Sequence, residues 1–150
     1  MQRILVVVGC QKDKLDKIPK RDKDVILDFI LSHQHTYDAT IAVVRGNVNG
    51  RRNFDQKGDT IGMGGMTLLD YPADNIIEVS GYDVDCKVFR KDAQYDIIGI
   101  STGASVLCAA MSMYSAGLKV NVLQKYCSDR KGVHSQAIAI MNAYMEGCVK

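Results

Sequence analysis

The residues best suited to chemistry form a short turn, Ser101-Thr102-Gly103-Ala104-Ser105, directly after the apolar run Tyr95–Ile100. Thr102 is expected to cap a helix here, so that the three backbone amides after it lack partners inside the helix and point into a crevice. Such amides carry a partial positive charge and attract anions. The Ser105 hydroxyl would serve there as a ligand or as a nucleophile. The alternative interpretation is that Thr102 and Ser105 are ordinary capping residues.

The elements around this turn must position it. An apolar strand (Tyr95–Ile100), a helix (Ala104–Ala116) ended by Gly117, and a second strand (Lys119–Gln124) follow one another with short connections. This order is typical of a parallel sheet that is buried on both faces. The other expected elements are strands at Arg3–Gly9, Ala39–Arg45 and Asn75–Val79, a helix from Pro19 to about His33, an irregular stretch Ser80–Lys91 with a distorted helical turn around Val84–Phe89, and a closing helix from about Lys131 to Met145.

These elements predict one doubly wound α/β domain over residues 1–150, with helices on both faces of a parallel sheet. Right-handed connections give the strand order 3-2-1-4-5. Strands one and four are then neighbours where the strand order reverses, which is where open α/β sheets bind ligands. We therefore expect Gly9-Cys10-Gln11 to lie beside Thr102-Gly103-Ala104-Ser105.

The composition argues against several classes of partner. The chain is 47% hydrophobic and 24% charged with a net charge of +2, which is too slight to favour nucleic acid or a membrane surface. Acids and bases alternate in Lys12–Asp24, so this run is interpreted as a solvated face. The apolar run Ile4–Val8 is too short for a signal peptide or a membrane span, and a cytoplasmic protein is expected.

The cysteines and histidines do not predict a metal centre or a cofactor. The five cysteines show no Cys-x-x-Cys pair and no zinc spacing, so they are expected to be reduced thiols, with Cys108 buried against the sheet. His33 and His35 lie too close together to share one helix face as metal ligands. No metal and no cofactor are expected.

A long connection, Gly46–Gly65, is rich in Gly, Asn and Arg and has no period, so it is interpreted as an ordered loop or lid over the carboxyl edge of the sheet. Its basic residues Arg51 and Arg52, with Arg45 and Asn53, would contact an anionic ligand; the alternative is a solvated basic surface. The tract Gly62-Met63-Gly64-Gly65 lacks a preceding strand and a following Lys-Ser/Thr, which argues against a nucleotide P-loop.

Five segments together resemble the isochorismatase-like cysteine hydrolase family, which includes nicotinamidases. The segments are Leu5–Asp13 (LVVVGCQKD), Val43–Phe54 (VVRGNVNGRRNF), Ile76–Val84 (IIEVSGYDV), Gly99–Asp129 and His134. The resemblance spans almost the whole chain and is most specific from Gly99 to Asp129. It implies the doubly wound fold, a homo-oligomer, and a site that hydrolyses amides or vinyl ethers of small metabolites with an aspartate, a lysine and a cysteine.

None of the three catalytic residues that the resemblance implies is present. The aspartate position falls on Gly9, with Gln11 and Asp13 retained. The lysine position falls on Val79, and a shift of one residue reaches only Glu78 or Ser80. The cysteine position falls on Ser105, whose hydroxyl is far less acidic than a thiol and needs a base within reach.

The resemblance also implies which residues would contact a ligand. Gly9 is expected to enlarge the crevice and to remove a negative charge, which makes anions more acceptable there. The expected ligand-binding residues are Gly9, Cys10, Gln11, Arg45, Asn53, Phe54, Tyr82, Thr102, Gly103, Ala104 and Ser105.

Three functions follow as hypotheses. The first is a catalytically degenerate protein that binds a small metabolite, either nicotinamide-related or a nucleotide-derived anion, for sequestration or sensing. The second is an altered hydrolase with Ser105 as the nucleophile, activated by Asp13, Asp83 or Asp85. The third is an oligomeric scaffold that binds a partner, in which pocket substitutions are silent.

Overall fold

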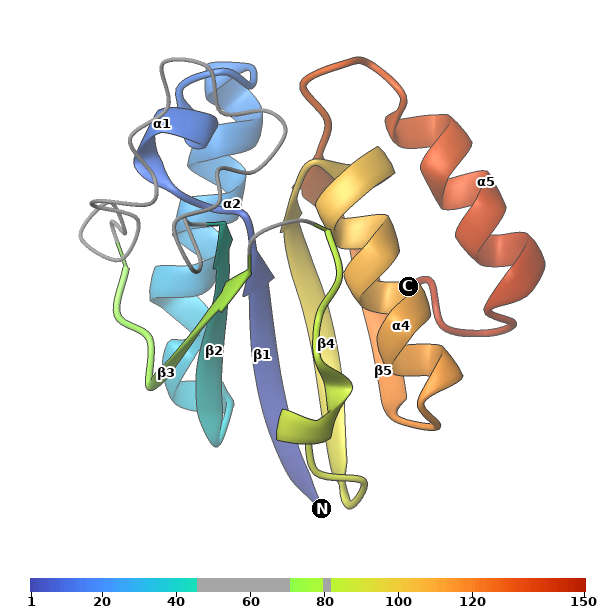
Figure 1. Ribbon diagram of the computed structural model, residues 1–150. Helices are drawn as coiled ribbons and strands as arrows, with labels where there is room; N and C mark the ends of the chain where they lie inside the picture. The colour runs from blue at the N-terminus through green and yellow to red at the C-terminus, as the bar shows by residue number, and fades with distance from the viewer. Residues whose placement is uncertain (46–70, 80–81) are drawn as a thin grey trace.

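The structure is a computed structural model that describes residues 1–45, 71–79 and 82–150. Its five strands form one all-parallel sheet in the order β3-β2-β1-β4-β5 (Figure 1). This confirms the predicted fold class and strand order. The strands are β1 (Gln2–Val8), β2 (Ala39–Arg45), β3 (Asn75–Val79), β4 (Ala93–Ile100) and β5 (Lys119–Ser128).

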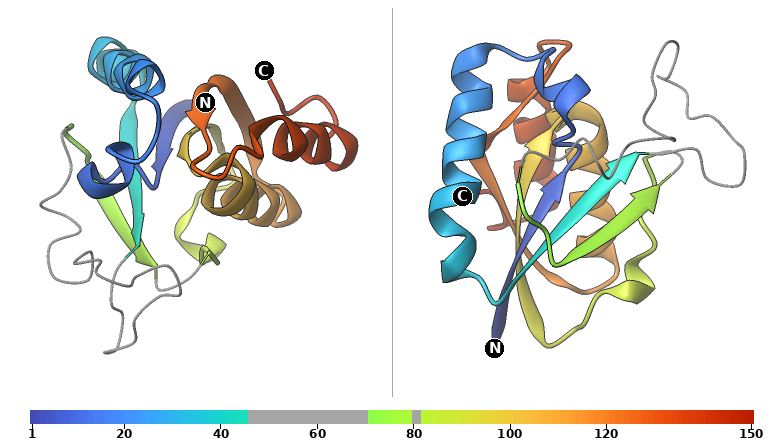
Figure 2. Two further views of the ribbon diagram at one scale, coloured as in Figure 1. Left: turned by 90° about the horizontal axis from the view of Figure 1, so that it is seen from above. Right: turned by 90° about the vertical axis from the view of Figure 1, so that its left-hand side faces the viewer.

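Helices cover both faces of the sheet. Figure 2 shows α1 and α2 on one side and α4 and α5 on the other. The described helical segments are α1 (Lys12–Leu15), α2 (Lys20–His33), η1 (Gln34–Thr36), η4 (Cys86–Val88), η5 (Thr102–Val106), α4 (Leu107–Ser115) and α5 (His134–Tyr144). None of the described helices has the length and apolarity needed to cross a membrane.

The apolar run of β1 explains how the core divides into two layers. Successive side chains of a strand point to opposite faces. Ile4, Val6 and Val8 therefore enter the cluster under α4 and α5, whereas Leu5 and Val7 enter the cluster under α2. All five side chains are buried, which is the pattern of a parallel sheet with helices on both faces.

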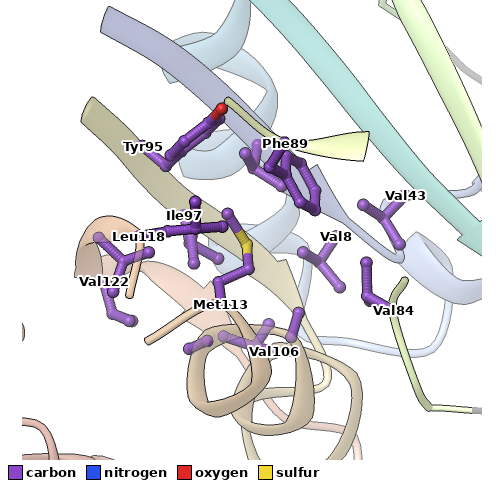
Figure 3. Packing of buried hydrophobic residues seen from close by; sticks show 14 of the residues in the cluster. Val8, Val43, Val84, Phe89, Tyr95, Ile97, Val106, Met113, Leu118 and Val122 are labelled. Atoms are coloured by element: carbon purple, nitrogen blue, oxygen red, sulfur yellow. The ribbon is translucent and has the colours of Figure 1, made fainter. Parts of the chain in front are cut away.

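Figure 3 shows the layer under α4 from close by. Val8 of β1 and Ile97 of β4 pack there with Val106 and Met113 of the η5–α4 segment. Val106 and Met113 have no exposed surface. The start of α4 is thus held firmly against the ends of the two central strands.

Several element boundaries differ from those expected. The β4–β5 connection begins earlier, with the π-helical turn η5 at Thr102, and α4 continues it from Leu107 to Ser115. β5 extends beyond Gln124 to Ser128 after a register shift between Ile97 and Gly99 of β4. α5 begins at His134, three residues later than expected. The short helix α1 was not predicted, and the predicted loop Gly46–Gly65 lies outside the described residues.

The end of the chain covers the free edge of β5. The Val122 amide donates to the Cys148 carbonyl (2.7 Å), and the Lys150 amide donates to the Val122 carbonyl (2.9 Å). Because an unpaired strand edge exposes its amides and carbonyls, this pairing satisfies groups that would otherwise be open to another chain.

Candidate ligand-binding site

Two small cavities meet at the carboxyl ends of the central strands, on either side of Ser105 and Tyr82. The first, called here the polar cavity, measures ≈ 20 Å³ as the space open to the centre of a water molecule. Its lining residues are Lys14, Tyr82, Ile100, Ser101, Ala104, Ser105 and Arg130. The second, called here the apolar cavity, measures ≈ 10 Å³ and is lined by Val8, Gly9, Val43, Val79, Tyr82, Val84 and Ser105.

The structure brings together the three positions that the resemblance assigns to catalytic residues. Gly9, Val79 and Ser105 all line the apolar cavity. They follow β1, end β3 and follow β4, so the carboxyl edge of the sheet brings them into one place. The lining that they form is mostly apolar, because the Ser105 hydroxyl is the only polar side-chain group among the three.

Gly9 does not enlarge the crevice as expected. Its φ of 67° lies in the left-handed region, and a Cβ built on it would overlap the Ile100 carbonyl oxygen. The direction in which an aspartate side chain would leave the backbone is therefore filled by the β4 main chain. The expectation was wrong because the glycine permits a close approach of two strands rather than an open space.

Lys14 is the main residue of the candidate site that sequence reasoning missed. It belongs to the charged run that was interpreted as a solvated face, yet only 4% of its surface is exposed and it lines the polar cavity beside Ser105. The tight turn α1 begins three residues after Gly9, with the Lys14 and Leu15 amides donating to the Gln11 carbonyl (3.0 and 2.8 Å). This turn brings the lysine back over the end of the sheet.

Arg130 supplies a second positive charge to the polar cavity from the connection between β5 and α5. It was missed because the predicted strand ended four residues too early. The signal available in the sequence was position alone: a basic residue just after a parallel strand lies at the same edge as the other strand ends. Arg130 and Lys14 thus reach the cavity from opposite sides of β4.

The amides of the η5 turn have partners within the protein, contrary to expectation. Ser101 rather than Thr102 precedes the turn, and its carbonyl accepts from the amides of Ala104 and Val106 (both 3.1 Å). The Gly103 amide donates to Asp129 Oδ2 (2.7 Å). Two of the three amides predicted to face a ligand are therefore occupied, and positive charge in the cavity comes from side chains instead.

Thr102 does not face the cavity either. It is fully buried, and its hydroxyl lies 2.8 Å from His134 Nδ1 at the start of α5. Its predicted role as a capping residue was wrong, because its hydroxyl is hydrogen-bonded to a histidine that is distant in the sequence and not to the backbone of its own helix. Ser101, Ser105 and Tyr82 are the described residues with a hydroxyl group that line the polar cavity.

Cys10 and Gln11 also lie away from the cavity lining. Both have no exposed surface, and Cys10 packs in the apolar layer under α2. Burial raises the pKa of the Cys10 thiol far above its usual range. Neither side chain lines the two cavities, because the backbone turns after Gly9 and directs both inward, and their contact with a ligand stays a prediction.

No buried thiol replaces the missing nucleophile. Burial raises the pKa of Cys127 to about 12, and it also raises the pKa of Cys86 and Cys108. A thiolate nucleophile requires the opposite shift. Cys108 is half-buried rather than buried as expected, and the charge of Asp83 adds to the rise of its pKa.

Several predicted residues have no described side chain. Asn53 and Phe54 lie outside the described residues, as do the side chains of Arg45 and Asp13. The other two carboxylates considered as bases for Ser105 line neither cavity: Asp85 caps η4 by accepting from the Lys87 amide (3.0 Å), and Asp83 is exposed.

Within the described ranges, no three His, Cys, Asp or Glu side chains cluster so that they could hold a metal ion. The described residues at this edge of the sheet therefore do not fit a metal centre. Among the described residues, the charged side chains that line the polar cavity are a lysine and an arginine, which repel a cation.

The comparisons with known proteins show similarity in structure. No protein-family profile and no curated protein matches the sequence. A nicotinamidase from Staphylococcus aureus is 23% identical and matches over 99% of this chain and 96% of its own, with a TM-score of 0.68. A pyrazinamidase from Pyrococcus horikoshii, crystallised in complex with zinc, is 18% identical and matches over 100% and 98%, with a TM-score of 0.74.

A third solved structure extends the similarity beyond these amidases. It is an isochorismatase-like hydrolase from Alkaliphilus metalliredigens, 12% identical, matching over 100% of this chain and 94% of its own with a TM-score of 0.70. All three matches cover nearly the entire chain, with TM-scores between 0.68 and 0.74. The chain has the α/β fold of the isochorismatase-like superfamily.

Proposed function

We propose that this protein binds a small metabolite through an anionic group in the polar cavity and does not turn it over by cysteine-hydrolase chemistry. The observation that carries the proposal is the convergence of Lys14 and Arg130 on one cavity with the hydroxyls of Ser101 and Ser105. Two cations and two hydroxyl donors in a partly enclosed site favour an oxyanion, because charge-assisted hydrogen bonds are stronger there than in water.

The size of the cavity limits what enters it. A water molecule needs roughly 10–15 Å³ of this kind of space. The ≈ 20 Å³ of the polar cavity therefore suits the outer atoms of a carboxylate or a phosphate, and not an aromatic ring. The non-polar part of the ligand would lie towards the apolar cavity, and Tyr82, which is half-buried between the two cavities, would have to move to admit a ring.

The absence of turnover is inferred from the three substituted positions. Gly9 carries no carboxylate, Val79 no ammonium and Ser105 no thiol, so these three positions do not supply the base, cation and nucleophile of a cysteine hydrolase. A nicotinamide-related acid or a nucleotide-derived anion carries a carboxylate or a phosphate that matches the size and charge of the polar cavity, and its ring would enter only if Tyr82 moved. Binding without turnover would serve sequestration or sensing of such a metabolite.

Two matched ligand pairs test the proposal by isothermal titration calorimetry. Nicotinate and nicotinamide share a ring but differ in charge, as do AMP and adenosine. We expect the anionic member of at least one pair to bind about 10–100-fold more tightly than its neutral partner, which corresponds to one or two hydrogen bonds to a charged group. Equal binding within both pairs, or no binding of any of the four, would contradict the proposal.

A second function is favoured by one observation, the presence of Lys14 in the cavity that holds Ser105. A lysine can act as the general base for a serine nucleophile. In that reaction the neutral amine would take the Ser105 hydroxyl proton as the Oγ–acyl bond forms, and the leaving group would receive the proton before water releases the acid. The two functions require opposite protonation states of Lys14, because anion binding uses the charged ammonium.

Covalent labelling separates the two functions. If Ser105 is a nucleophile, a fluorophosphonate probe should modify it, and both Ser105→Ala and Lys14→Met should abolish labelling. Intact-protein and peptide mass spectrometry would locate the modified residue. An unlabelled wild-type protein, or labelling that persists in Ser105→Ala, rejects the hydrolase.

A further inference from the structure

Asp129 connects the two segments that line the polar cavity. One of its carboxylate oxygens accepts from the Gly103 amide in the η5 turn (2.7 Å). The other accepts from the Lys131 amide (2.7 Å) and, more distantly, from the Val133 amide (3.5 Å). A single side chain thus binds the turn that carries Ser105 and the connection between β5 and α5 that carries Arg130.

Close packing reinforces this connection. A Cβ added to Gly103 would lie 2.5 Å from Val133 Cγ2 and 3.1 Å from Asp129 Oδ2, so the turn and the connection touch without spare room. Both segments lie at the same end of the sheet, above the start of α4 (Figure 1). The pairing of Ile100 with Ser128 in the sheet brings them there side by side.

The base of the connection is also fixed. The Ser128 hydroxyl donates to Asp22 Oδ2 of α2 (2.7 Å). This hydrogen bond joins two residues that lie far from each other in the sequence. Arg130 therefore lies in a segment that is hydrogen-bonded on both sides. The Ser128 side chain before it binds α2, and the Lys131 amide after it binds Asp129. Its guanidinium is long and flexible, so its place in the cavity depends on how firmly this backbone is held.

We propose that Asp129 is a positioning residue, which holds Arg130 at the distance from the Ser105 turn that an oxyanion requires. This inference rests on the proposed anion-binding function. Asp129 does not line the polar cavity, so it acts through the backbone and not by contact with the ligand. Its loss should weaken anion binding only as far as Arg130 contributes to that binding.

A double-mutant cycle with inorganic phosphate as the probe tests this role. Phosphate would be titrated into ¹⁵N-labelled wild-type protein, Asp129→Asn, Arg130→Gln and the double variant, with ¹H–¹⁵N spectra reporting both binding and folding. We expect each single substitution to weaken phosphate binding by about fivefold or more, and the double variant to bind no more weakly than Arg130→Gln. Such non-additivity is the signature of residues that act together.

The controls keep the outcomes distinct. Lys131→Gln removes an exposed positive charge from the same connection and should change the affinity less than twofold. If Asp129→Asn does not fold, Gly103→Ala displaces the same connection by steric contact and carries the same expectation. Additive losses in the cycle overturn the positioning role while anion binding stands. A wild-type protein that binds no phosphate, nicotinate or AMP overturns both.

Discussion

Replacing Gly9 with alanine is expected to lower the free energy of unfolding by about 2–4 kcal/mol, the sum of a left-handed backbone penalty and the cost of overpacking. The residue has a φ of 67°, and the new methyl group would overlap the Ile100 carbonyl oxygen. That oxygen belongs to the backbone of the central strand β4, so it cannot move aside at low cost. Gly9→Asp, the substitution that would restore the carboxylate of the related hydrolases, is expected to be at least as destabilising.

Gly117→Ala is the matched control for this prediction. Gly117 has a φ of 80°, but no atom lies within 4 Å of the position that a Cβ would take. This variant should therefore lose only the backbone contribution, about 1–2 kcal/mol. Urea denaturation of both variants would give the two losses, and a Gly9→Ala loss no larger than that of Gly117→Ala would show that the two strands are not in such close contact.

The Gly9 result also bears on function. If the carboxylate cannot be introduced without displacing β4, the proposed loss of cysteine-hydrolase chemistry would be built into the backbone and not only into the identity of three side chains. Adding Val79→Lys and Ser105→Cys to the chain would then leave the catalytic residues incomplete. In this respect the proposed binding protein would differ from an enzyme whose activity a few side-chain substitutions could restore.

Lys14→Met is expected to weaken binding of the anionic ligand by about 10–100-fold, since removing one hydrogen bond to a charged group costs about 1.5–3 kcal/mol. Methionine preserves the apolar length of the side chain, which is 4% exposed, so the fold should be retained.

Lys12→Met is the control for Lys14→Met. Lys12 lies in the same short helix but is exposed, so its replacement removes the same formal charge at the surface and should change the affinity less than twofold. Calorimetric titration of nicotinate or AMP into the wild type and the two variants would give the comparison. Equal losses for both lysines would mean that a general surface charge, and not the polar cavity, attracts the anion.

The fold could be predicted because its determinants are local. The unbroken apolar run of β1 and the one at the end of β4 require burial on both faces, and helices between strands supply that burial. The handedness of the connections then leaves one strand order. The rule that the carboxyl ends of parallel strands meet at one edge of the sheet also correctly placed the end of β1 beside the turn after β4.

The site could be predicted only in outline, because its charges depend on contacts between distant segments. The charge pattern around Lys14 is that of any exposed helix, and nothing local distinguishes it from Lys12. The helix start at residues 101–105 was assigned a local cap, whereas Asp129 and His134, 26 and 32 residues away, take the Gly103 amide and the Thr102 hydroxyl.

The sequence by itself determined the parallel sheet, its order and the edge at which a ligand would bind, since periodicity and connection length are properties of neighbouring residues. Only the tertiary structure decided what that edge carries. It showed that Gly9 does not enlarge the crevice, because the Ile100 carbonyl of β4 occupies the position that a side chain on Gly9 would take. It also placed Lys14 and Arg130 in one cavity, because the charge of a site is the sum of side chains that meet only after the chain has folded.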